Sequence, residues 1–575
     1  MVQRDDVADG ALWDLSANQS VVELSGLVFR EMKKDDATRH MYEVSFKPAQ
    51  TTKQAAAQPW LLLGSGGAAG VKIGAVKQYA HAGAIALAIS SVLAVDPLLV
   101  IEAALSLVQA LPHGRQLVLL TDCIRMPHET RGVRPHHGGL WGLARSVRAE
   151  DPSAKITCVD TKVGLCADVV SADSAGAEAE LVMRGPSARF LPRLTQFTPS
   201  DAPPTVAQEP PIRAMQIVTG GTGGLGLLTA RWLAQCGAAG LALASRSGKL
   251  DESSPDCAQL HAAAAAADVL LVRCNMGESA DVHRLVQSAQ GHTPQVEGVW
   301  HAAGVLADAL VPALSAELLS RSYAPKACGA WHLHGACATL RVTACALFSS
   351  VVTIIGGAGQ ANYAAANACL DALAAGRRNL ATAATSVQWG GWAEAGMATR
   401  GAASKRMAAK EAAMGVSRIS LAFGLATLDA AAQLKLPPAL LMFPVVWRKM
   451  LGSASAVPPL LLDLAPRQAP KPVGAMKTGS GGGGCAAASA TISIEDVIDM
   501  VKSAAGGDPD ADAPLMEVGI DSLGAVELRN QLQMAVGDAM TLPSTLVFEH
   551  PTARSLAELM SEVRVSSSDA AGGPM

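Results

Sequence analysis

The sequence predicts two α/β domains followed by a small all-helical domain. Apolar strand-like runs alternate with Ala-rich helical stretches from Met41 to about Leu191 and again, more regularly, from Ala214 to about Leu464. This alternation is typical of βαβ units, which build parallel sheets. A Pro-rich break at 199–211 separates the two series. The stretch 491–565 has amphipathic helical segments without strand-like runs, which completes the prediction.

Changes in composition divide the chain into six parts. The linker is the clearest of them, because its prolines and its run of glycines favour a solvated tether over a packed element. The N-terminal part carries charge runs with little periodicity, which indicates a connector. We therefore expect a connector at 1–40, a first α/β domain at 41–200, a second at 212–464, a flexible linker at 465–490, a helical domain at 491–565 and a tail at 566–575.

The bulk composition excludes several classes of protein. Of the 575 residues 17% are charged and 50% are apolar, and the formal net charge is −4. These values exclude a disordered acidic chain and a basic nucleic-acid binder. The eleven cysteines form no CxxC pair, so neither a disulfide framework nor a metal site is indicated. The longest largely apolar run, Ala84 to Val95, is too short for a membrane span, and we expect a cytoplasmic protein.

A dinucleotide site is predicted at the start of the second α/β domain. The segment Ala214–Leu228 contains an apolar strand, a glycine-rich turn and the start of a helix. Glycines at this spacing allow a tight turn and let backbone N–H groups approach a pyrophosphate at the helix N-terminus. Such a turn often serves packing alone, so its context decides. The loop residues expected to bind the cofactor are Gly220, Gly221, Thr222, Gly223, Gly224, Leu225 and Gly226.

The context favours NADPH. Twenty residues after Gly226, at the end of the next apolar strand, stands Ser245-Arg246, where an NAD site would place an acidic residue for the ribose hydroxyls. The guanidinium of Arg246 suits a 2′-phosphate instead, although a solvated surface arginine is the common alternative. A second glycine-rich turn at 64–70 has no such partner, and we interpret it as structural.

A catalytic set is predicted between Leu347 and Leu370. This segment reads as a strand ending at Ser350, a glycine-rich loop and a helix opening at Tyr363. Asn367 lies four residues after Tyr363 and therefore on the same helix face, and Lys326 lies upstream. Each residue alone has an ordinary alternative as a cap, a packing group or a solvated charge. Together, in the spacing of a known enzyme family, they resemble an active site.

The order of these residues resembles a known enzyme family. Ser350, Tyr363 and Asn367 are similar to the active-site pattern of short-chain dehydrogenase/reductases, and the pairing of Asn367 with an upstream Lys326 resembles polyketide synthase ketoreductases in particular. The same resemblance extends to TGGTGGLG at 219–226, SRSG at 245–248, HAAGVLAD at 301–308 and SVQWGGWAEAGMA at 386–398. Residues 137–152 resemble that family's structural subdomain.

The resemblance implies a fold and an activity. The expected fold is α/β, with two Rossmann-like subdomains (doubly wound parallel sheets), the first truncated and cofactor-free, followed by a four-helix-bundle carrier domain. The expected activity is reduction of a carrier-bound β-ketoacyl thioester to a β-hydroxyacyl thioester with NADPH. Beyond the glycine-rich loop, the implied cofactor contacts are Ser245, Arg246, Asn275, Met276, Ala302, Ala303, Gly304, Lys326 and Tyr363.

The implied roles fit the chemistry of ketone reduction, which needs a proton for the developing alkoxide. Tyr363 would supply that proton, and Lys326 would lower the pKa of Tyr363 and bind the ribose. Ser350 would donate a hydrogen bond to the carbonyl oxygen, and Asn367 would hold a relay water or the lysine.

Two departures from the family pattern affect the detailed predictions. Asp308 matches the aspartate that marks ketoreductases giving a D-configured hydroxyl, although Ala307 replaces the first aspartate of that motif. The opposite stereotype has a tryptophan before the tyrosine, where this chain has Ile354-Ile355, so we expect the D product. Asn275 stands where an aspartate usually contacts the adenine, and its amide can still hydrogen-bond.

The C-terminal domain resembles acyl carrier proteins. Residues 516–530 resemble the phosphopantetheine attachment motif, with Ser522 at a helix N-terminus that suits a phosphodiester. A simple helix cap is the commoner role for such a serine, but the ending at 542–552 is also typical of carriers. The resemblance implies 4′-phosphopantetheine on Ser522, added by a phosphopantetheinyl transferase. The 13 Asp and Glu against 4 Lys and Arg at 491–565 would favour basic partner surfaces.

Three functions remain open from the sequence. The first is a reductase acting in cis or in trans on a carrier-bound chain, and the intact catalytic set favours it. The second is a module that only places or epimerises the substrate, and the third is a free-standing oxidoreductase for a small alcohol. The sequence contains no ketosynthase, acyltransferase, dehydratase or enoylreductase motif, so we expect other polyketide synthase domains or modules as partners.

Overall fold

The structure is a computed structural model that divides into two compact units, residues 1–450 with 457–464 and residues 451–456 with 465–575. Within the described residues, no helix combines the length and apolarity that crossing a membrane needs. The structure describes chiefly residues 37–48, 60–63, 84–88, 96–111, 116–122, 137–161, 178–183, 188–198, 213–291, 295–394, 411–452 and 457–466, three short N-terminal strands and parts of 494–560.

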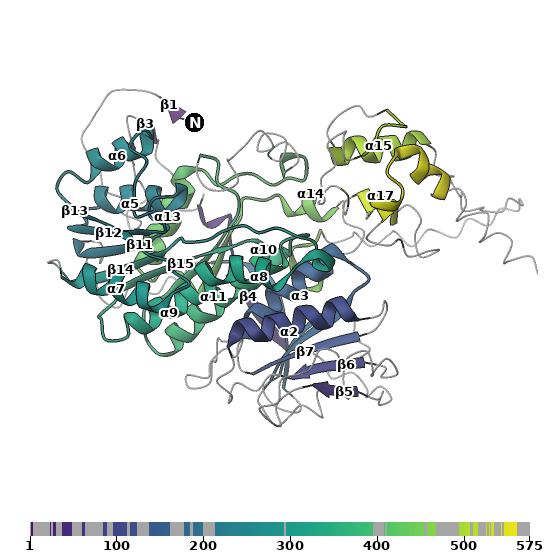
Figure 1. The fold of residues 1–575 in the computed structure, drawn as a ribbon, viewed down its shortest axis with the longest axis horizontal. Helices are drawn as coiled ribbons and strands as arrows, with labels where there is room; N and C mark the ends of the chain where they lie inside the picture. The colour runs from purple at the N-terminus through teal and green to yellow at the C-terminus, as the bar shows by residue number, and fades with distance from the viewer. Residues whose placement is uncertain are drawn as a thin grey trace, which may run out of the picture. The chain divides into compact units, whose positions relative to one another are not determined.

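The first unit contains a fourteen-stranded sheet (Figure 1). One half of it is parallel, in the order β13-β12-β11-β14-β15-β16-β17. The other half is also parallel, in the order β9-β8-β7-β6-β5. The strands of the first half are Asp268–Arg273, Gly240–Ser245, Met215–Thr219, Val296–His301, Ala344–Ser350, Thr385–Trp389 and Ala439–Met442. Those of the second are Glu180–Met183, Lys155–Thr161, Gln116–Asp122, Ala84–Ala88 and Trp60–Leu63.

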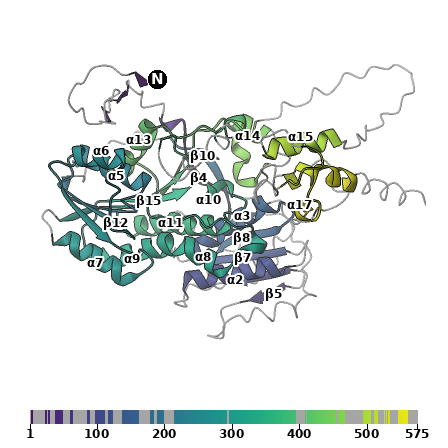
Figure 2. The same cartoon turned by 45° about the horizontal axis from the view of Figure 1, so that its top comes forward.

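Two antiparallel strands join the halves into one sheet. Strand β4 (Met41–Pro48) pairs with β17 on one side and with β10 (Arg189–Gln196) on the other (Figure 2). Strand β10 in turn pairs antiparallel with β9. The predicted α/β class with mostly parallel strands is confirmed. The continuous sheet was not predicted, and it leaves neither half with an open edge at the junction.

Helices cover both faces of the β11–β17 half (Figure 1). Helices α5 (Gly224–Gln235), α6 (Pro255–Ala263) and α13 (Leu421–Ala432) share one apolar core with the sheet. Helices α7 (Ser279–Gln290) and α9 (Gly329–Ala336) belong to a second core with α11 (Ala361–Asn379). The predicted helix starts at Leu225 and Tyr363 lie one and two residues inside the observed helices.

Helix α11 also belongs to a third core, with α2 (Pro97–Ala110), α3 (Gly139–Glu150) and α8 (Ala316–Tyr323). Helices α3 and α11 contact each other closely because small residues meet at the interface. A Cβ atom added to Gly142 would lie 2.2 Å from the carbonyl oxygen of Ala364. Helix α11 is therefore held between the two halves of the sheet.

The remaining elements are short. In the first unit they are β1 (Val2–Gln3), β2 (Glu23–Leu24), β3 (Leu27–Phe29), the 3-10 turns η4 (Val311–Ala313) and η7 (Pro459–Leu464), the π-helical turn η5 (Ala324–Cys328) and α10 (Val352–Ile355). Helix α14 (Trp447–Gly452) lies where the two units divide. The second unit has α15 (Ile494–Ala505), α17 (Leu546–Glu549) and its own apolar core. Ser522 and much of the predicted second carrier helix lie outside the described residues.

Candidate active site

The glycine-rich loop joins β11 to α5 in a shape that side chains would prevent. Gly220 has a φ of +67°, in the left-handed region that favours glycine. A Cβ atom on Gly226 would lie 2.1 Å from the carbonyl oxygen of Gly220. The N–H of Gly223 donates to that same oxygen at 2.9 Å. The turn therefore needs glycine at both ends, as a close approach of backbone to a phosphate requires.

A cavity of about 270 Å³ opens beside this loop. Arg246 lies at its wall with an exposed side chain. Three predicted cofactor contacts, Gly221, Lys326 and Tyr363, are not among the residues that line it. The N–H of Gly221 donates to the carbonyl of Ala244 at 3.2 Å. The lining includes the predicted Gly220, Thr222, Gly223, Gly224, Leu225, Gly226, Ser245, Arg246, Asn275, Met276, Ala302, Ala303 and Gly304, and also Ala244, Cys274, Val305 and Pro325, which the sequence did not predict.

Asn275 lines this cavity and is held by two hydrogen bonds. The Asn275 side chain accepts a hydrogen bond from the N–H of Gly277 at 3.2 Å. Its backbone N–H donates to a carboxylate oxygen of Asp281 at 2.8 Å. That hydrogen bond is the main reason that the pKa of Asp281 is lowered. A rigid wall is thus present where an adenine ring was predicted.

The four predicted catalytic residues come together at one end of the β11–β17 half. Ser350 ends β15, Tyr363 and Asn367 lie on α11, and Lys326 lies on η5. The Lys326 Nζ is 5.4 Å from the Tyr363 ring centroid and donates to the carbonyl of Phe348 at 2.6 Å. Asn367 Nδ2 donates to the Tyr363 carbonyl at 2.8 Å, and its Oδ1 is buried without a partner among the described residues.

The electrostatics of this cluster are dominated by burial. Burial raises the pKa of Tyr363 to about 12, and hydrogen bonds with Asn367 and Ser350 oppose the increase. The net shift of the Tyr363 pKa is thus upward, opposite to the predicted lowering, because burial dominates. Burial also lowers the pKa of Lys326 to about 7, against the opposing charge of Asp371. Tyr363 is thus held in its protonated form, as a proton donor must be.

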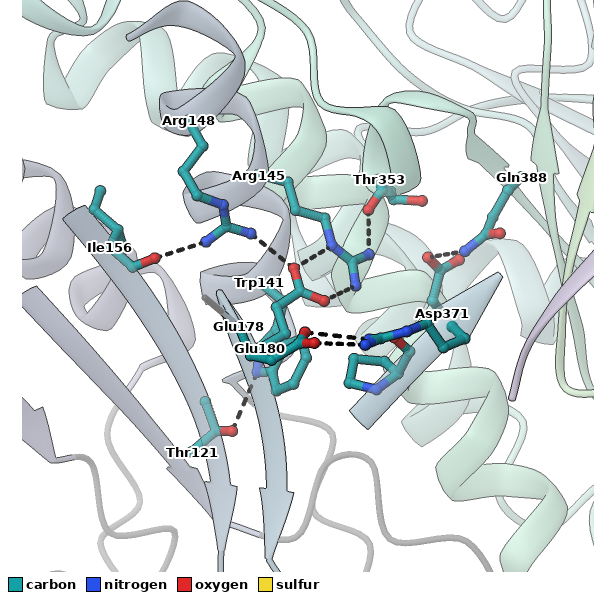
Figure 3. A network of polar contacts seen from close by, with 12 residues as sticks. Thr121, Trp141, Arg145, Arg148, Ile156, Glu178, Glu180, Thr353, Asp371 and Gln388 are labelled. Carbon is teal, nitrogen blue, oxygen red and sulfur yellow. Dashed lines mark hydrogen bonds and ion pairs between the residues drawn. The ribbon is translucent and has the colours of Figure 1, made fainter. Parts of the chain in front are cut away.

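Asp371 is a charged residue of this cluster that sequence reasoning missed. It lies on α11, four residues after Asn367, and is buried. Its two carboxylate oxygens accept hydrogen bonds at 2.7 Å from Ser386 Oγ and from Gln388 Nε2 (Figure 3 shows the Gln388 contact). Its spacing of eight from Tyr363 places it on the same helix face and could have revealed it.

His301 is a second missed residue, and it connects the lysine to the cofactor loop. One ring nitrogen, Nε2, is 2.8 Å from the carbonyl oxygen of Lys326, and the other, Nδ1, is 2.7 Å from the Thr219 hydroxyl. Burial lowers the pKa of His301 to about 4. Since a carbonyl can only accept, Nε2 carries the proton of the neutral ring and Nδ1 accepts from Thr219. His301 therefore positions Lys326 relative to Gly220.

The predicted stereocontrol residue lies beside the loop that precedes Tyr363. The Asp308 side chain is exposed to solvent on one side but has protein atoms around it on the other, and one of its carboxylate oxygens accepts a hydrogen bond from Gln360 Nε2 at 3.1 Å. Partial burial raises the pKa of Asp308, and the Gln360 contact opposes this. Ile354 and Ile355, which stand in place of the tryptophan of the opposite stereotype, lie at the end of α10.

Residues of α3 support the loop between Ser350 and Tyr363 (Figure 3). Arg145 forms two hydrogen bonds with the Glu180 carboxylate, at 2.7 and 2.6 Å, and donates a third to the carbonyl of Thr353 at 2.5 Å. Arg148 donates to the same carboxylate at 2.7 Å. All three charged side chains have a partner, so this network acts as structural support for the loop.

Comparisons with known proteins agree with this geometry. The family model for the KR domain matches residues 214–394, and that for the phosphopantetheine attachment site matches residues 495–560, a range that includes Ser522. The chain is 36% identical over 465 residues to polyketide synthase GfsB of Streptomyces halstedii, covering 76% of this chain and 8% of that protein. It is 34% identical over 470 residues to spectinabilin polyketide synthase system protein NorA of Streptomyces orinoci, covering 78% of this chain and 24% of that protein.

A solved structure described as an A1-type ketoreductase is similar over 74% of this chain and 99% of its own. The TM-score is 0.63 and the identity is 28%. The fold and site thus define the class as a Rossmann-like oxidoreductase of the short-chain dehydrogenase/reductase type. Within that class, the chain contains a polyketide synthase ketoreductase domain, and it also contains a phosphopantetheine attachment domain. These domains imply NADPH and 4′-phosphopantetheine as cofactors.

Proposed function

We propose that this chain reduces a carrier-bound β-ketoacyl thioester to the D-configured β-hydroxyacyl thioester with NADPH. The observation that carries the proposal is the convergence of Ser350, Tyr363, Lys326 and Asn367 near a cavity lined by the glycine-rich loop. The chain spans only 8% and 24% of the two curated relatives, so the activity of a whole synthase is not assigned to it.

The residues around the cavity suit a dinucleotide. Gly220 and Gly226 allow a turn so tight that a Cβ on Gly226 would lie 2.1 Å from the Gly220 carbonyl oxygen, and a turn of this kind lets backbone N–H groups face the pyrophosphate. Arg246 is exposed at the cavity wall and forms no ion pair or hydrogen bond with its side chain among the described residues, which leaves its guanidinium available for a 2′-phosphate. This supports NADPH over NADH.

The side chains then perform the proton chemistry. When bound, NADPH supplies a hydride to the carbonyl carbon. The Tyr363 hydroxyl gives its proton to the carbonyl oxygen, and Ser350 donates a hydrogen bond to that same oxygen. A charge on Lys326 favours the phenolate that results, and the unpartnered Oδ1 of Asn367 accepts from that ammonium or from a relay water.

The stereochemical part of the proposal depends on Asp308. It lies beside the loop that leads to Tyr363, and Ile354 and Ile355 occupy α10 where the opposite stereotype has a tryptophan. Solved ketoreductases described as A1-type, A-type and C2-type resemble this chain almost equally, with TM-scores of 0.63, 0.62 and 0.61. Similarity in overall fold therefore does not decide the configuration of the product. The D configuration therefore depends on the residues alone.

The carrier domain and the β5–β9 half of the sheet complete the proposal. Ser522 would receive 4′-phosphopantetheine from a phosphopantetheinyl transferase, in a carrier domain that forms a four-helix bundle. The β5–β9 half would be the truncated, cofactor-free subdomain, with a structural role toward α11. Ketosynthase and acyltransferase domains of the same synthase would supply the β-ketoacyl chain.

The test is NADPH oxidation, followed by absorbance, with a β-ketoacyl pantetheine thioester. Wild-type protein should consume NADPH, and Tyr363→Phe should not, while both bind NADPH equally in a fluorescence titration. If wild-type protein binds NADPH but consumes none, reduction is refuted and a module that places or epimerises its substrate becomes the better account.

A further inference from the structure

Glu150, the last residue of α3, contacts two segments of the active site that lie far from it in sequence. Its Oε1 accepts from the N–H of Val311 at 2.7 Å, and its Oε2 accepts from the N–H of Gly359 at 3.0 Å. The side chain is buried. A single carboxylate, on a helix that packs on the β5–β9 half of the sheet, thus holds both segments.

The two segments carry or precede residues of the proposed active site. The first, residues 307–311, contains Asp308, and the second, residues 356–360, leads directly into Tyr363. They also contact each other, since the N–H of Ala309 donates to the carbonyl of Gly359 at 2.9 Å and Gln360 donates to Asp308 at 3.1 Å. Their relative position fixes where Asp308 stands with respect to the proton donor.

We propose that Glu150 is a specificity-determining positioning residue, which holds Asp308 and Tyr363 in the arrangement that selects one face of the ketone. This inference rests on the proposed function, because it concerns the configuration of the alcohol that the site produces. Glu150 does not line the cofactor cavity, and it acts through the two backbone segments.

Other contacts of α3 act on the same loop from the same side. Arg145 donates to the carbonyl of Thr353 (Figure 3), and Ser146 Oγ accepts from the N–H of Gly357 at 3.3 Å. Within the described part of the chain, neither side chain forms a hydrogen bond with the segment 307–311. Glu150 differs from them because its carboxylate has an oxygen for each segment and connects the two.

A neutral amide cannot replace this carboxylate. In Glu150→Gln, the shape is kept, but one of the two backbone N–H groups must face an NH₂ group that cannot accept. One segment then loses its partner and can shift relative to the other. A tenfold loss of selectivity between the two faces of the ketone corresponds to about 1.4 kcal/mol between the two transition states. We expect the D:L ratio of the product to fall by about that factor.

The experiment compares wild-type protein, Glu150→Gln and Glu178→Gln. Each is given NADPH and a 3-oxoacyl pantetheine thioester, and the alcohols are separated by chiral chromatography. Hydrogen exchange is measured at the amides of Val311 and Gly359. Glu178 is the matched control, because it lies in the same part of the molecule and pairs with Arg193 instead of the two segments. Only Glu150→Gln should lower the D:L ratio and speed exchange at the amide, of Val311 or of Gly359, that then faces the NH₂ group.

Each outcome supports or overturns the positioning role of Glu150. An unchanged D:L ratio in a folded Glu150→Gln protein overturns the inference, whether or not the amides exchange faster. If Glu150→Gln fails to fold, Gln360→Leu cuts the link to Asp308 at a partly exposed position, and an unchanged ratio in that variant overturns it as well. If wild-type protein reduces no ketone, the proposed function fails. Hydrogen exchange in Glu150→Gln that is as slow as in wild-type protein at both amides would show separately that the carboxylate holds neither segment.

Discussion

The replacement Gly142→Ala tests whether the β5–β9 half positions the catalytic helix. The new Cβ would lie 2.2 Å from the carbonyl oxygen of Ala364, whereas ordinary contact begins at 3.4 Å. Helices α3 and α11 would have to separate by about 1 Å, and Ala364 is the neighbour of Tyr363. Such overpacking costs about 1–3 kcal/mol of stability. A misplacement of about 1 Å at the reacting groups can lower kcat by about 100-fold.

The assay measures kcat for NADPH oxidation together with the thermal unfolding midpoint. Gly335→Ala is the matched control, because it lies on a helix of the same unit and its Cβ would meet no atom within 4 Å. The control should keep its kcat and gain a little stability from the loss of a helical glycine. A Gly142→Ala protein with unchanged kcat would refute the reasoning, because α11 would then tolerate displacement from α3.

Three further predictions concern the cofactor loop and the buried lysine. Gly226→Ala should abolish NADPH binding in a fluorescence titration, because its Cβ would lie 2.1 Å from the carbonyl oxygen of Gly220; normal binding would contradict the loop geometry. Arg246→Ala should raise KM for NADPH by about 10- to 100-fold, because it removes a charged hydrogen bond that contributes about 1.5–3 kcal/mol. KM for NADH should stay unchanged, and equal changes in both KM values would contradict the 2′-phosphate role of Arg246. The Lys326 pKa is lowered to about 7, so above that pH the unfolded chain binds a proton that the native chain lacks. The stability of wild-type protein relative to Lys326→Met should therefore rise as the pH increases from about 7 toward 10.5, and a flat difference in unfolding midpoint would contradict the pKa.

Much of the fold and the site could be predicted from local sequence. Strand ends, glycine-rich turns and helix starts are set by residues close in the chain, so the end of β15 and the starts of α5 and α11 were expected within two residues. Three of the four predicted catalytic residues lie within a single segment from Ser350 to Asn367, and Lys326 precedes it by only 24 residues.

The rest depends on contacts between distant segments. The pairing of β4 with β17 joins residues about 400 positions apart, and no local pattern specifies it. Glu150 and His301 look like an ordinary helix-end charge and a strand-end histidine until their partners are known. The predicted downward shift of the Tyr363 pKa was wrong because the sequence indicated a nearby charge but could not show how deeply the side chain is buried.

The most direct test of the central claim follows the carrier-bound chain itself. The protein is converted to its phosphopantetheinylated form, loaded with a β-ketoacyl group and incubated with NADPH, and the intact mass is recorded. The account predicts a gain of two hydrogen atoms on the bound chain in wild-type protein, no gain in Tyr363→Phe and no loading in Ser522→Ala. A loaded wild-type protein that binds NADPH and keeps its mass would contradict reduction by this site.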